Sequence, residues 1–96
     1  MARYVLERYR PRSGSEFLRD AAERLDSSAR QLRAEGTHVE YLDTIFLPGD
    51  ETCLHLFEAA SEAGVRAAAE RAGIDVDRVV PAEHVGQHEA GFGCRR

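Results

Sequence analysis

The chain has 96 residues, of which 43% are hydrophobic and 31% charged, with a formal net charge of −4. This length fits one domain, and the acidic balance argues against a dedicated nucleic-acid-binding protein, because duplex binding needs a basic face. No apolar run approaches the ~20 residues of a membrane span, and charges interrupt the N-terminus where a signal peptide would be apolar. We therefore expect a cytoplasmic protein.

The first part of the chain reads as a strand followed by a helix. Residues 3–9 alternate in the manner of a short strand. Ser13 and Glu16 have the spacing of a helix capping box, and Gly36 stands where a left-handed helix cap is expected. The pattern predicts a helix over 15–35. Its apolar stripe consists of Leu18, Ala21, Ala22, Leu25, Ala29 and Leu32.

The second part repeats strand signals around a turn and ends on another helix and strand. Residues 38–58 alternate on both sides of a Pro-Gly turn, which is the pattern of a β-hairpin. A second helix is expected over 61–72, capped by Ser61 and ended by Gly73. Residues 77–85 have the composition of a last strand.

The resulting β-α-β-β-α-β order is the split-βαβ arrangement. We predict a ferredoxin-like α+β domain over residues 1–85, with a four-stranded antiparallel sheet and two helices on one face. Residues 86–96 are glycine-rich, and we expect them to form a flexible C-terminal tail. Right-handed crossovers place the first and third strands in the centre, and this scheme runs those two strands parallel to each other.

The hairpin also predicts which side chains share a face of the sheet. Its even-length loop pairs position 46 with 53, 44 with 55, and 42 with 57. One face then carries Ile45, Leu54 and Leu56, and we assign this face to the helices. The opposite face is too apolar to be left in water, so we expect a homodimer formed sheet to sheet. That opposite face carries Leu42, Thr44, Phe46, Cys53, His55 and Phe57.

Three stretches of the chain look familiar: residues 4–8, 56–59 and 69–79. They resemble the bacterial domain-of-unknown-function family 4242, whose members are often described as nickel-binding proteins. The resemblance extends over residues 2–85 and implies a ferredoxin-like fold, a dimer and Ni²⁺ binding. Two histidines and one cysteine of the family pattern are replaced in this chain, at Asp43, Ala68 and His55 respectively.

His55 is the strongest single candidate for a metal ligand. It falls on a central strand two residues from Cys53, and imidazole and thiolate are both good ligands for nickel, copper or zinc. We place His84 near the same end of the sheet. The alternative is that His55 is a hydrogen-bonded interface histidine and His84 a surface one. The predicted metal site therefore consists of His55, Cys53 and His84.

Other residues leave further functions open. Asp43 falls on the expected helix side, where a buried carboxylate would be a candidate general base, but no nucleotide-binding or hydrolase motif accompanies it. Four arginines form a local basic patch, which either pairs with an anionic ligand or is a solvated face matched by nearby glutamates: Arg3, Arg8, Arg10 and Arg12.

We predict a small, non-enzymatic, dimeric binding protein for a divalent transition metal such as nickel. The alternative is a small dimeric α/β-barrel enzyme or small-molecule-binding domain that uses the open sheet face with His55, Thr44 and Phe57. A purely structural or partner-binding domain is a third interpretation.

Overall fold

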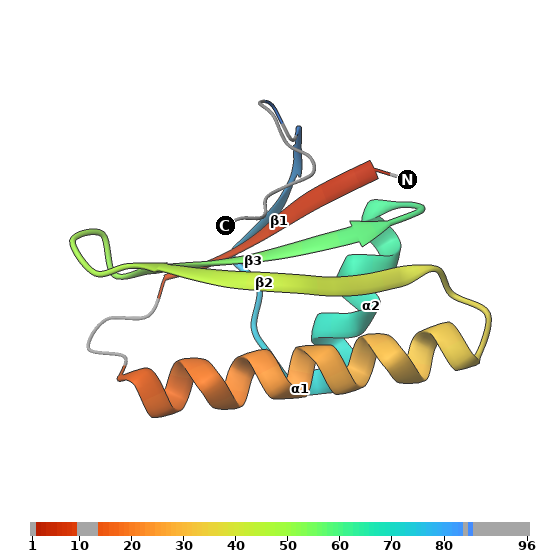
Figure 1. Cartoon of the computed structure of the whole chain (residues 1–96), viewed down its shortest axis with the longest axis horizontal. Coiled ribbons are helices and arrows are strands. Elements are labelled where there is room, and N and C mark those ends of the chain that lie inside the picture. Colours follow the sequence, from red (N-terminus) through yellow and green to blue (C-terminus); the bar gives the residue numbers. More distant parts are fainter. Residues whose placement is uncertain (1, 10–13, 84, 86–96) are drawn as a thin grey trace.

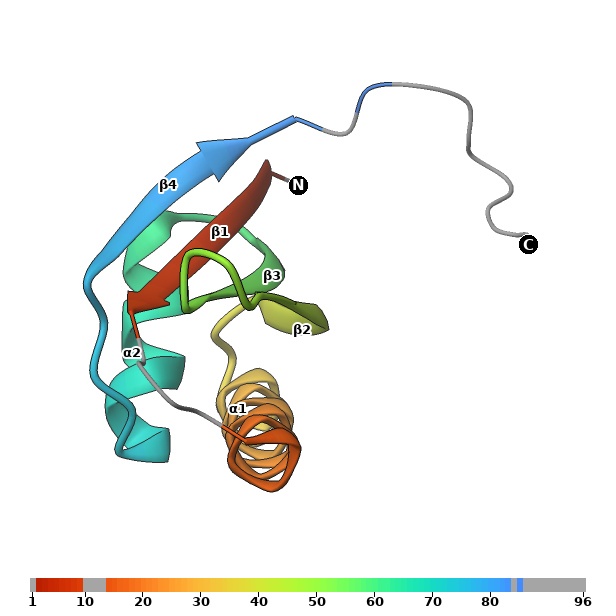
Figure 2. The same ribbon diagram turned by 90° about the vertical axis from the view of Figure 1, so that its left-hand side faces the viewer.

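A computed structural model describes residues 2–9, 14–83 and 85. Within these ranges four strands form one sheet, and two helices lie on the same side of it (Figures 1 and 2). The predicted ferredoxin-like α+β class is confirmed, while the predicted tail over 86–96 lies outside the described residues. The elements are β1 (Ala2–Tyr9), α1 (Ser15–Ala34), β2 (Val39–Leu47), β3 (Thr52–Ala59), α2 (Glu62–Ala72) and β4 (Arg78–Ala82).

The sheet has the strand order β2-β3-β1-β4, so the first and third strands occupy the centre as predicted. All neighbouring strands are antiparallel. This includes the central pair β1 and β3, which we predicted from the sequence to be parallel. The reason is that the crossover through α1 makes β1 and β2 run in the same direction with a gap between them. The hairpin then brings β3 back through that gap in the opposite direction.

Both helices end at the glycines that the sequence indicated. Gly36 has φ +100° and Gly73 has φ +71°, a region that glycine adopts without a steric penalty. The N–H of Thr37 donates to the carbonyl of Leu32 at 2.9 Å, which closes the Schellman motif that ends α1. Such a cap turns the chain sharply back toward the sheet, where β2 begins.

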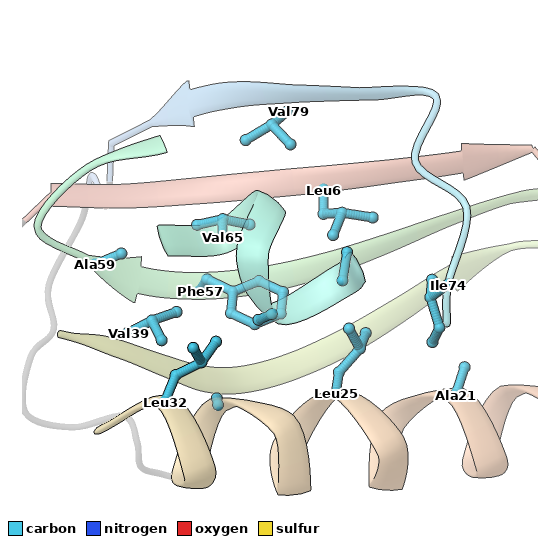
Figure 3. Packing of buried hydrophobic residues seen from close by; sticks show 13 residues of the cluster. Leu6, Ala21, Leu25, Leu32, Val39, Phe57, Ala59, Val65, Ile74 and Val79 are labelled. Carbon is cyan, nitrogen blue, oxygen red and sulfur yellow. The ribbon is translucent and has the colours of Figure 1, made fainter. Parts of the chain in front are cut away.

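The hydrophobic core lies between the helices and one face of the sheet. Figure 3 shows the Phe57 ring pointing from β3 toward the helices, with Leu25 of α1 and Val65 of α2 facing it. Fully burying one such side chain stabilises the folded chain by about 1.5–3 kcal/mol. This layer therefore supplies most of the hydrophobic stabilisation. The buried apolar cluster contains Leu6, Ala21, Leu25, Ala29, Leu32, Val39, Phe57, Ala59, Val65, Ala68, Ala69, Ile74 and Val79.

The helices cover the face of the sheet opposite to the one predicted. Cys53, His55 and Phe57 point inward and are fully buried, whereas Ile45, assigned to the helix side, is 52% exposed. Strand alternation says which side chains share a face, but it does not say which face the helices cover when both are apolar. Phe57, expected at a dimer interface, is therefore part of the core. We call the helix-covered side the inner face and the other side the open face.

A β-bulge in β2 changes the predicted pairing at one point. The two pairs nearest the turn form as predicted, but Phe57 pairs with Tyr41 rather than Leu42, because the register shifts between Tyr41 and Asp43. One extra residue moves the alternation of side chains by one position. Tyr41 therefore joins Thr44 on the inner face. Its ring packs edge-on against Phe57, with ring centroids 5.7 Å apart.

Candidate functional site

A group of polar side chains is buried on the inner face beside the core. His55 and Cys53 are fully buried on β3, and Arg8 of β1 is only 4% exposed. Arg8 pairs directly across the two strands with Cys53, and residues opposite each other in a sheet point to the same side. We call this group the inner polar cluster, and it consists of Arg8, Tyr41, Thr44, Cys53 and His55.

Three members of the inner polar cluster form a continuous chain of hydrogen bonds. Nδ1 of His55 lies 2.8 Å from Oγ1 of Thr44, and that oxygen lies 2.5 Å from the hydroxyl of Tyr41. Tyr41 and Thr44 are three positions apart, so a regular strand would point them to opposite faces. The bulge therefore makes this chain of hydrogen bonds possible, because it brings both hydroxyls to the inner face. We call the chain from His55 through Thr44 to Tyr41 the relay.

The imidazole of His55 is neutral over the physiological pH range. Burial, followed by the positive charge of Arg8, lowers the pKa of His55 from 6.5 to about 4. A charged imidazole here would lose its hydration and lie near another cation. Burial also raises the pKa of the Tyr41 phenol above its usual value. All three groups of the relay are uncharged near pH 7, so each can donate or accept a hydrogen bond.

The second nitrogen of His55, Nε2, has no hydrogen-bond partner among the residues that the structure describes. A neutral imidazole carries its proton on one nitrogen only, and both hydrogen bonds of the relay take their direction from which nitrogen carries it. In one of the two arrangements the proton is on Nδ1. Nδ1 then donates to Thr44, and Thr44 donates to Tyr41. In this arrangement the O–H of Tyr41 is left to donate outward from the relay.

Arg8 is the member of the inner polar cluster that sequence reasoning missed. The sequence placed it on a solvated basic face, since arginine is seldom fully buried. Its guanidinium instead lies over the ring of Phe17, 5.4 Å from the ring centroid. The signal for its position was its place two residues after Leu6, because alternate residues of a strand share a face. Arg10 and Arg12 lie outside the described residues.

Asp43 shows the reverse of what Arg8 shows, because it was predicted to be buried and is exposed. It is exposed at the edge strand rather than buried on the helix side, and its carboxylate accepts a hydrogen bond from the backbone N–H of Thr44 at 2.8 Å. The bulge, with its extra residue at this point, is the reason for the changed direction. A buried general base at this position is therefore not found.

Cys53 and His55 lie on the same face of β3, two residues and so about 6.5–7 Å apart along the strand. Among the described residues, no group of three or more His, Cys, Asp or Glu side chains could hold a metal ion. The buried guanidinium of Arg8 beside this pair also opposes a second cation. These two donors, taken within the described part of one chain, do not fit a nickel centre.

His84, the third predicted donor, lies outside the described residues. The strand that leads toward it ends at Ala82, which pairs with Arg3. Cys53, by contrast, pairs with Arg8 near the other end of β1. The sequence predicted that the last strand ends near Cys53. In the structure the register of β4 places the end of this strand at the opposite end of the sheet from Cys53. The metal role of His55, Cys53 and His84 stays a prediction.

The open face carries a different kind of candidate site, a continuous apolar stripe. Ile45 pairs with Leu54 across β2 and β3, and Leu56 pairs with Val5 across β3 and β1. Val5 in turn pairs with Val80 of β4. These five side chains, which we call the open-face stripe, run across all four strands on the side that neither helix covers (Figure 2).

Comparison with known proteins places the chain in a family. A family model described as nickel responsive protein SCO4226-like matches residues 4–81. The chain belongs to this family. Its fold also matches the crystal structure of SCO4226 from Streptomyces coelicolor A3(2), with a TM-score of 0.75 and 19% sequence identity over 88% of this chain and 100% of that one. No curated protein matches the chain. The resemblance seen in the sequence is confirmed, and the structural match supports the fold alone.

Proposed function

We propose that this member of the SCO4226-like family is a small cytoplasmic binding protein with a nickel-related role, and that it works as a homodimer. The nickel-related role is supported by the description of the family, which names a response to nickel. Among the residues that the structure describes, neither helix has the length and apolar composition of a membrane span. The observation that carries the dimer is the open-face stripe.

The open-face stripe is unfavourable in an isolated chain. Ile45 is 52% exposed at its edge, and the neighbouring Leu47 is 38% exposed. Contiguous apolar patches of this kind are uncommon on monomers, and burying them contributes about 25 cal/mol for each Å² removed from water. A domain of this length also has a thin stability margin of its own. Both points favour a protein partner over water on this face.

The charges that border the stripe favour a second copy of the same chain as that partner. Arg3 lies 3.8 Å from Glu58, and Arg78 lies 3.0 Å from Glu7. A two-fold axis places the same patch on both sides of an interface, so a border that contains both signs can be complementary to itself. A border of a single sign would repel its own copy.

Sedimentation velocity tests the dimer. The wild-type chain should sediment at twice its mass of 10.7 kDa. Leu54→Glu places a carboxylate in the stripe opposite Glu7 and should give a monomer with an unchanged far-ultraviolet circular dichroism spectrum. Ala34→Glu, at the exposed end of α1, is the matched control and should remain a dimer. A monomeric wild-type chain would contradict the proposal.

The predicted metal donors are tested separately, by titrating Ni²⁺ into the protein in a calorimeter. Because Cys53 and His55 are buried beside Arg8, we expect the double variant Cys53→Ser, His55→Ala to retain the wild-type nickel affinity. His84→Ala tests the third donor in the same way. A large loss of affinity in the double variant alone, with its fold intact, would support the metal site that the sequence predicted.

The alternative interpretation, a small-molecule site on the open sheet face, is changed by the structure. It relied on His55, Thr44 and Phe57, and all three point to the inner face instead. A small-molecule site made from these residues would therefore open toward α1 and not toward the dimer interface.

A further inference from the structure

We propose that the groove between α1 and β2 binds small, uncharged, mainly apolar molecules that carry a carbonyl oxygen, with the Tyr41 hydroxyl as hydrogen-bond donor. The groove lies on the inner side of the sheet. Its lining contains no residue of the open-face stripe and none of the predicted metal donors, and of those donors only His55 lies behind it.

The apolar part of the groove comes from two elements. Leu18 and Ala22 of α1 face Phe46 of β2, and all three side chains are partly exposed. Leu18 and Ala22 are four positions apart, so they lie one above the other on the same side of the helix. The short side chain of Ala22 leaves space against β2. The groove is wide open to solvent and has a volume of about 320 Å³.

The polar groups of the groove are the two hydroxyls of the relay. Tyr41 and Thr44 both line it, and His55 lies behind them with Nδ1 on the Thr44 hydroxyl. We assign the imidazole proton to Nδ1, so that His55 donates to Thr44 and Thr44 donates to Tyr41, and the O–H of Tyr41 is then left for a ligand. A group that receives this hydrogen bond must be an acceptor, and a carbonyl oxygen is the simplest neutral one.

Two charged side chains of opposite sign also lie at the groove. Arg19 and Asp43 both line it, and both are exposed. Each of these charges attracts an ion of the opposite sign as strongly as it repels one of its own sign, so together they add no net charge to the groove. A groove without net charge is compatible with an uncharged ligand.

The bulge in β2 supports a ligand-binding role for the two hydroxyls. Without the extra residue, Tyr41 and Thr44 would point to opposite faces of the sheet. Bulges are enriched beside active and binding sites, where they redirect a side chain. In this chain the bulge brings together two hydroxyls, 2.5 Å apart, in the wall of one groove.

Nuclear magnetic resonance titration of the full ¹⁵N-labelled chain with 4-fluoroacetophenone tests this proposal. The ketone should shift the amide signals of Leu18, Ala22 and Phe46. Two matched probes, fluorobenzene without the carbonyl and the anion 4-fluorobenzoate, should bind more weakly. Tyr41→Phe should weaken ketone binding about tenfold, which corresponds to the loss of one hydrogen bond. Tyr4→Phe, a tyrosine that packs against the core outside the groove, is the control and should bind like wild type.

Two further variants separate the groove from the relay. Ala22→Leu fills the space between α1 and β2 and should abolish ketone binding with the relay intact. Thr44→Val breaks the relay, so it should weaken binding and also change the ¹⁵N chemical shifts of the His55 ring. The proposal is overturned if the groove amides do not shift at the solubility limit of the ketone. Equal binding of ketone and fluorobenzene, or an unchanged affinity in Tyr41→Phe, would also overturn it.

Discussion

The two faces of the sheet differ in how their apolar side chains are kept from water. On the inner face two helices of the same chain cover β3, and Phe57 is fully buried together with the polar His55. On the open face the alternate residues of the same strand, Leu54 and Leu56, keep part of their surface exposed, and no element of the described chain covers them. Coverage by helices, rather than the hydrophobicity of a face, therefore decides what is buried within one chain.

The largest expected difference between the faces is in the loss of stability on truncation. Phe57→Ala removes a buried ring from the core and should lower the free energy of unfolding by about 3–5 kcal/mol. Leu56→Ala, one residue earlier on the open face, should have a smaller effect that grows with protein concentration, because that side chain is covered only in the dimer. Urea unfolding at two protein concentrations measures both. Equal, concentration-independent losses would remove the distinction between the faces.

The buried imidazole on the inner face should make stability depend on pH. The pKa of His55 is lowered from 6.5 to about 4, so below pH 6.5 the unfolded chain binds a proton that the folded chain does not. This contribution to stability is present above pH 6.5 and is lost as the pH falls toward 4, with a maximum of about 3 kcal/mol. His55→Gln should therefore lose stability less steeply than wild type between these pH values. Parallel slopes in urea unfolding would show that His55 is not the group responsible.

A smaller effect is expected from removing one hydroxyl on each face. Thr44→Val leaves the buried Nδ1 of His55 without its partner at 2.8 Å, which should cost about 1–3 kcal/mol. Thr52→Val removes an exposed hydrogen bond to the carbonyl of Asp50, and water can replace that bond, so the loss should stay below about 1 kcal/mol. The difference between the two midpoints of thermal unfolding measures this contrast. A reversed order would mean that the relay is not formed in solution.

The fold could be predicted because its signals are local. Gly36 and Gly73 mark the helix ends through their positive φ, and the order of periodic segments then leaves few topologies. The choice of inner face was wrong because Ile45 and Phe57 are similarly apolar, so alternation alone could not distinguish the two sides.

The candidate site was harder to predict than the fold. His55 and its neighbour Thr44 were paired correctly from the hairpin register. The contact of Tyr41 with Thr44 depends on one extra residue in β2, and the sequence there alternates acceptably with or without a bulge. Arg8 was missed because burial of an arginine contradicts the usual preference of that residue. Both errors concern polar groups held inward by the surrounding structure, which local patterns do not report.

The proposed dimer is tested most directly by measuring whether the open face is exposed to solvent. Methyl groups exposed to solvent relax faster when a soluble gadolinium chelate is added, and the chain contains its own references: Val65 is fully buried and Val85 is 81% exposed. The Ile45 methyls of the wild-type chain should relax as slowly as those of Val65, and should become fast in Leu54→Glu. Ile45 methyls that relax as fast as those of Val85 in the wild-type chain would contradict the claim that a second copy covers this face.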